Sequence, residues 1–140
     1  MKITVLNREE NNEYYDNYIH QIPEDLSLKD AYQQSISEVV EFFTAIPEEK
    51  GIYRYAEGKW SIKEVFQHLI DSERIFAYRM FRIGRGDKAA LAGFDQNEYI
   101  EPSGADAKTM TALIEEFQVH IEVMNGIERK FGQSKVLINA

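Results

Sequence analysis

The side chains in this sequence that could hold a metal ion or move a proton are histidines and carboxylates. The chain has three histidines, His20, His68 and His120, and no cysteine. Without cysteine there is no disulfide, no thiolate zinc site and no catalytic thiol, so metal chemistry would have to use His, Asp and Glu. No two histidines are four residues apart, so no single helix offers a pair of imidazoles to one metal ion.

His68 is the best candidate for a metal ligand, and Asp71 follows it one helical turn later. On a helical wheel His68 lies at the edge of an apolar stripe, where an imidazole can point into a cleft, and Asp71 lies about 60° from it. Asp71 could be a second ligand or a partner that orients the imidazole. The same spacing also fits a half-buried histidine bonded to a neighbouring side chain. A catalytic zinc site normally uses three protein ligands, and this pair falls short of that.

A run of basic residues comes after His68, and it has two interpretations. The simpler one is a solvated helix end whose positive charges complement the helix dipole. The alternative is that Arg79 and Arg82, which share a face with His68, attract an anionic substrate. The run consists of Arg74, Arg79, Arg82, Arg85 and Lys88. The sequence has no phosphate-binding glycine loop and no Gly-x-Ser-x-Gly turn, and nothing supports a serine triad.

These residues must be positioned by helices, and three segments have the apolar spacing of amphipathic helices. The first covers about residues 27–45, and Ser27 with Asp30 has the spacing of a capping box. The third covers about residues 106–131. Its apolar stripe is Met110, Leu113, Ile114, Phe117, Ile121, Met124 and Phe131.

The second helix, at about residues 61–84, has the strongest signal and carries His68. Ser61 and Glu64 have the spacing of a capping box, and Trp60 stands where a hydrophobic staple would pack. Gly84 and Gly86 are candidates for its end. The apolar stripe that the periodicity predicts is Val65, Phe66, Leu69, Phe76, Met80 and Ile83.

The rest of the chain lacks such periodicity. Residues 1–26 form an irregular lead-in, and residues 85–105 have no helical period and predict a long loop, a kind of segment that often covers a site. A length of 140 residues suits a single domain spanning residues 1–140. Three long helices without strand alternation predict an all-α bundle.

Composition excludes several classes of partner. The chain has 16 basic and 24 acidic residues, a net charge of −8, which repels the phosphates of nucleic acids. No stretch approaches the roughly 20 apolar residues that span a bilayer. The N-terminus has no apolar segment of signal-peptide length. These features predict a soluble cytoplasmic protein that binds neither nucleic acid nor membrane.

Several runs of residues resemble one family. The run 53–65 contains Gly-Lys-Trp-Ser-Ile-Lys-Glu, and the run 67–79 begins Gln-His-Leu-Ile-Asp. Arg-Gly-Asp at 85–87 and Gly-Phe-Asp-Gln-Asn-Glu-Tyr at 93–99 follow in the same order. Together they resemble the DinB-like (DinB/YfiT-like) superfamily of metalloenzymes, over roughly residues 10–131.

This resemblance implies an up-down four-helix bundle, often dimeric, with a divalent metal, typically Zn or Ni, held by three histidines. One ligand comes from the His-Leu-x-Asp motif, which is His68 here, and two come from a His-x-x-x-His pair on the last helix. Characterised relatives include S-transferases that use the metal to activate a small thiol such as bacillithiol, and others are isomerases or hydrolase-like. The resemblance therefore implies a metal-dependent transferase or hydrolase. Asp71 would be an auxiliary partner of the site and Arg79 an anion contact.

The sequence departs from the family pattern at its end. It stops at Ala140, before the expected last helix and its two histidines, and His120 falls where relatives carry a residue that binds no metal. A single histidine would bind a transition metal weakly, which leaves open that the chain carries none. Three helices without the fourth would also expose apolar surface, which predicts a homodimer. Two copies of His68 could then share a site; the alternative is a non-catalytic helical interaction module, or a shortened gene product.

Overall fold

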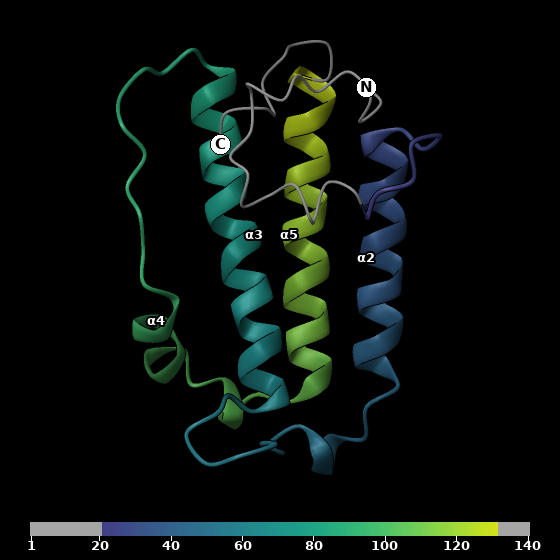
Figure 1. The fold of residues 1–140 in the computed structure, drawn as a ribbon, viewed down its shortest axis with the longest axis vertical. Coiled ribbons are helices and arrows are strands. Elements are labelled where there is room, and N and C mark those ends of the chain that lie inside the picture. The colour runs from purple at the N-terminus through teal and green to yellow at the C-terminus, as the bar shows by residue number, and fades with distance from the viewer. Residues whose placement is uncertain (1–20, 132–140) are drawn as a thin grey trace.

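The structure is a computed structural model. It describes residues 21–131, apart from the side chains of residues 28, 124, 125 and 127–131. All regular elements in this part of the chain are helices, which confirms the all-α prediction. The long ones are α2 (Leu28–Thr44), α3 (Ile62–Gly84) and α5 (Met110–Phe131), and a shorter α4 (Gln96–Ser103) lies between the last two in sequence. Figure 1 shows the three long helices side by side, with α4 beside the lower half of α3.

The helix α5 packs against both of the other long helices. The chain descends through α2, turns through a 3₁₀ segment at Glu48–Lys50, and rises through α3 (Figure 1). The residues that follow α3 then return along its outer side, so that α5 starts at the same end as α3 and runs parallel to it. This return explains why 25 residues separate two neighbouring parallel helices, from 85 to 109.

Local sequence signals set most of the helix ends. The capping box of α3 is present: the Ser61 hydroxyl accepts a hydrogen bond from the Glu64 backbone N–H at 3.0 Å, and the Glu64 carboxylate accepts one from the Ser61 N–H at 2.7 Å. At α2, the Ser27 hydroxyl accepts from the Asp30 N–H at 3.1 Å. The helix α3 ends at Gly84, and Gly86 follows with a φ of 73°, a left-handed conformation that favours glycine.

Two elements differ from their predicted bounds. The third long helix begins at Met110 rather than near residue 106, because Ala105–Ala107 form a separate 3₁₀ turn. The predicted loop 85–105 contains α4, which was missed because it has only one buried apolar side chain, Ile100, and carries Pro102 inside it. Its start is capped by the Asp95 carboxylate, which accepts from the Asn97 N–H at 2.9 Å.

The core is centred on one phenylalanine from each long helix. The ring of Phe66 in α3 stacks on Phe43 of α2, with 3.8 Å between ring centroids, and contacts Phe117 of α5 at 5.6 Å. Phe66 is fully buried, as are Ile70 and Leu113. These contacts pack the three long helices against one another near the start of α3.

The buried side of α3 is rotated relative to the predicted stripe. Val65 is 40% exposed and Phe76 is 47% exposed, although both were predicted to face the core. Ile70, which the predicted stripe left out, is fully buried. The reason is that α3 turns its Phe66 and Ile70 side toward its neighbours, so part of the apolar arc found by periodicity faces solvent.

A second contact fixes α3 relative to α5. Lys63, which is 5% exposed, donates a hydrogen bond from Nζ to the Glu48 carboxylate at 2.6 Å. The other oxygen of Glu48 accepts from the Met110 backbone N–H, at the first turn of α5, at 2.8 Å. The hydrogen bond from Lys63, followed by that from Met110, lowers the pKa of Glu48. One carboxylate therefore holds the starts of both helices in register.

Candidate functional site

His68 lies in the second turn of α3, half-buried, and its ring contacts Trp60. The two ring centroids are 5.1 Å apart and the planes are tilted by 50°. Burial lowers the pKa of His68, and the negative charge of Asp71 opposes that shift. Within residues 21–131 no side chain or backbone group forms a hydrogen bond with the imidazole. The ring is therefore neutral near pH 7 and offers an unprotonated nitrogen, as a metal ligand must.

Asp71 does not form a hydrogen bond with His68. Its Oδ1 atom instead accepts from Gln67 Nε2 at 3.0 Å and from Arg74 Nη1 at 2.8 Å. The two residues that the sequence paired as ligand and partner are thus one turn apart on α3 but face different neighbours. Asp71 belongs to a polar network between α3 and α5.

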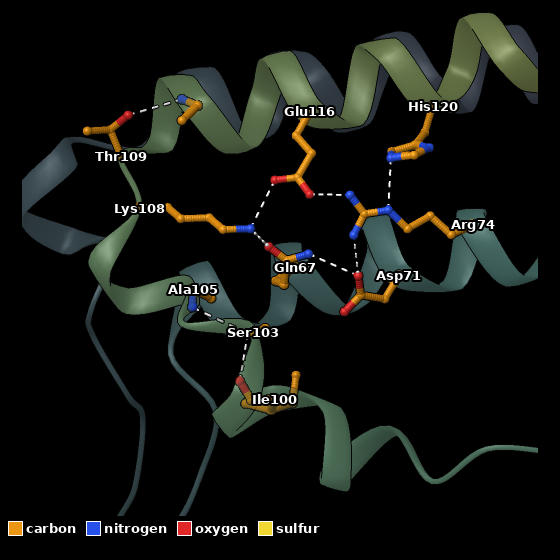
Figure 2. A network of polar contacts seen from close by, with 11 residues as sticks. Gln67, Asp71, Arg74, Ile100, Ser103, Ala105, Lys108, Thr109, Glu116 and His120 are labelled. Carbon is orange, nitrogen blue, oxygen red and sulfur yellow. Dashed lines mark hydrogen bonds and ion pairs between the residues drawn. The ribbon is translucent and has the colours of Figure 1, made fainter.

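Arg74 is the centre of that network, as Figure 2 shows. Its Nε donates to His120 Nε2 at 2.8 Å, one terminal nitrogen donates to Asp71, and the other donates to Glu116. All three nitrogens of the planar guanidinium donate a hydrogen bond, one to α3 and two to α5. Arg74 was predicted to be part of a solvated helix end; its side chain is indeed 41% exposed, but it also connects two helices, which the sequence did not predict.

Lys108 completes the network from the segment before α5. Its Nζ donates to Gln67 Oε1 at 2.6 Å and to Glu116 Oε2 at 3.0 Å (Figure 2). Burial alone would raise the pKa of Glu116, but the hydrogen bonds from Lys108 and Arg74 outweigh it and lower that pKa. Glu116 is therefore ionised and pairs with both cations, while Asp71 supplies the second negative charge of the network.

His120 is a neutral acceptor in this arrangement. Burial, followed by the positive charge of Arg74, lowers its pKa. Because Nε2 accepts a hydrogen bond from Arg74, the ring proton must be on Nδ1. A lone pair used in this way is not offered to a metal ion, and the sequence did not assign His120 as a ligand.

Four residues of the network, Gln67, Asp71, Arg74 and Lys108, line an open cavity of about 560 Å³ between α3 and α4. The two cations and the two carboxylates of the network form ion pairs with one another, so these charges hold the helices together.

The two arginines predicted to attract an anionic substrate hold the chain that follows α3. Arg79 Nη2 donates to the backbone carbonyl of Ala92 at 3.0 Å. Arg82 Nε pairs with Asp87 at 2.6 Å, and its Nη2 donates to the carbonyl of Ala89 at 3.3 Å. The returning segment is thereby fastened to the outer side of α3.

A signal for the network was present in the sequence. Gln67, Asp71 and Arg74 are spaced by four and three residues on α3, and Glu116 and His120 by four on α5. Each set forms a polar stripe beside a buried apolar one. Two such stripes on neighbouring helices indicate an interhelical network, although the periodicity cannot say which helices are neighbours.

The described residues supply only part of the metal site that the resemblance implies. Within residues 21–131, no three or more histidine, aspartate or glutamate side chains come close enough together to hold a metal ion. His68 fits the chemistry of a ligand, but as a single one. His20 lies outside the described residues.

Comparison with known protein families matches residues 31–127 of this chain, including His68 and the whole of α3, to the DinB superfamily. A comparison with curated proteins found no match, and a comparison with solved structures found none either. No helix between residues 21 and 131 is long and apolar enough to cross a membrane. The family match covers more than half of the chain, and the helical bundle agrees with it. This chain belongs to the DinB superfamily.

Proposed function

We propose that this protein is a metal-dependent transferase or hydrolase of its superfamily, in which His68 binds a divalent ion such as Zn or Ni. The observation that supports this proposal is the state of His68: half-buried, neutral and without a hydrogen-bond partner among the described residues. A small thiol is the substrate class that we propose for a transferase. Since residues 21–131 contain one ligand, the others must come from elsewhere in the chain or from a second copy.

The two histidines of the bundle provide a matched test. We expect purified untagged protein to retain about one metal ion per chain, and we expect His68→Gln to reduce this to background. His120→Gln is the control, because it replaces a half-buried imidazole that already accepts from Arg74, and glutamine can still accept there. The measurement is metal content by plasma mass spectrometry. Equal metal in both variants, or none in the unmodified protein, would refute the proposal.

A second candidate is a non-catalytic helical module that associates with its own copy. It is favoured by exposed apolar side chains: Val65 and Phe76, which share one side of α3, and Phe42 of α2, which is 64% exposed. Exposed apolar groups of this kind mark interaction surfaces in soluble proteins.

This candidate makes a prediction about assembly. We expect the protein to sediment as a dimer at micromolar concentration and the Phe76→Glu variant to sediment as a monomer, because a charge would be buried at the contact. Tyr78→Glu is the control, since Tyr78 is 58% exposed but lies on a different side of α3. A monomer in sedimentation velocity of the unmodified protein, or a dimer that persists in Phe76→Glu, would contradict it.

A further inference from the structure

An open cavity of about 620 Å³ lies where the end of α2, the segment before α3 and the start of α4 come together. Its volume falls within the range of roughly 300–1,000 Å³ that is usual for small-molecule sites. Five of its eleven lining residues are aromatic: Phe42, Phe43, Tyr53, Tyr55 and Trp60.

Three of these aromatic side chains remain largely in solvent. Phe42 is 64% exposed, Tyr53 is 61% exposed and Tyr55 is 72% exposed. Phe43, by contrast, is buried and stacked on Phe66, so the floor of the cavity is a rigid part of the core. Aromatic groups gathered around a rigid floor can stack on a flat ring without reorganising the fold.

The charge of the cavity is opposite to that of the chain as a whole. The protein has a net charge of −8, yet no aspartate or glutamate between residues 21 and 131 lines this cavity. Its one charged lining residue is Lys59, whose Nζ lies 5.9 Å from the centre of the Tyr55 ring. Gln96 and Asn97 add amide groups. The nearby Asp95 is engaged in capping α4.

We propose that this cavity binds a small planar aromatic carboxylate. The ring would stack among Tyr53, Tyr55 and Trp60, and the carboxylate would pair with Lys59 Nζ. A cation would meet Lys59 with no carboxylate among the described lining residues to offset it, so charge selects an anionic ligand over a cationic one of the same shape. This binding needs no metal ion, although a ligand that contacts Trp60 would lie next to His68.

The chain has a single tryptophan, so Trp60 gives one indole N–H signal in a proton–nitrogen NMR spectrum. The experiment titrates three probes with the same ring system, 2-naphthoate, 2-naphthalenemethanol and 2-naphthylmethylamine, in the presence of a chelator. The chelator makes the result independent of the proposed metal site. We expect naphthoate to shift the Trp60 signal and to bind about three- to fivefold tighter than the neutral alcohol, with the amine weakest.

Variants separate the two parts of the site. Lys59→Gln should bring the affinity for naphthoate to that for the alcohol while leaving the alcohol unchanged, and Tyr55→Ala should weaken the binding of both. Lys50→Gln, which removes an exposed cation outside the cavity, should change neither. The proposal is overturned if no probe shifts Trp60, if the three probes bind alike, or if Lys59→Gln leaves naphthoate affinity intact. It is also overturned if the Trp60 signal shifts with protein concentration alone, because a second copy would then occupy the cavity.

Discussion

Replacing Phe66 with alanine is expected to lower the free energy of unfolding by about 3–5 kcal/mol, the largest effect of any single change considered for this bundle. Phe66 is fully buried, and among the side chains that the structure describes it is the one whose ring contacts aromatic rings from both neighbouring helices, Phe43 and Phe117. Its removal loses the transfer free energy of the ring and leaves a cavity that three helices, held by polar contacts at their ends, can fill only in part. Urea unfolding followed by far-ultraviolet circular dichroism measures this change.

Phe81→Ala is the matched control, because Phe81 is a phenylalanine of the same helix that is 43% exposed. We expect it to change the free energy of unfolding by less than about 1 kcal/mol. If both variants lost the same stability, the bundle would not be centred on Phe66. The slope of the unfolding curve should stay the same in Phe81→Ala, since the surface exposed on unfolding hardly changes.

Helix ends were predictable from sequence because the interactions that set them are local. Ser61 and Glu64 cap each other across three residues, and Gly84 ends the same helix. The bounds of α4 were not predictable in this way. Its cap, Asp95, is a common turn residue, and Ile100 is the only buried side chain in it, so nothing distinguishes it from a loop until it packs on α3.

The candidate site was predictable only where one helix carries it. The position of His68 on α3 follows from the helical pattern and from the motif that resembles the family. Arg74 was misjudged because its partners Glu116 and His120 lie 42 and 46 residues further along the chain. Charge near the end of a helix indicates a favourable dipole interaction, but only the packing of α3 on α5 brings Arg74 to its partners on the neighbouring helix. The contact of Arg79 could not be predicted for a similar reason, since its partner is a backbone carbonyl in the returning segment.

The network makes Arg74→Met the second large effect, with an expected loss of about 1–2 kcal/mol in the free energy of unfolding, because solvent screens the contacts of a guanidinium that is 41% exposed. Methionine keeps much of the side-chain length but donates no hydrogen bond. Asp71 would lose its cationic partner, and His120 would lose its donor. Glu116 would keep Lys108. Arg79→Met is the control, because Arg79 is on the same helix and forms a single hydrogen bond, to the Ala92 carbonyl, and we expect it to cost less than about 1 kcal/mol.

The pKa of His120 distinguishes loss of this network from a general loss of packing. In the folded protein burial and Arg74 hold that pKa below the ordinary value of 6.5. The unfolded chain therefore takes up this proton first as the pH falls through 6.5, and His120 reduces stability below that pH. Arg74→Met removes one of the two causes, so the pKa of His120 should rise and the loss of stability on acidification should shrink. An NMR titration of the His120 ring signals in the unmodified protein and in the variant measures this change. A His120 pKa that stays unchanged in the variant would contradict the hydrogen bond from Arg74, whatever happens to stability.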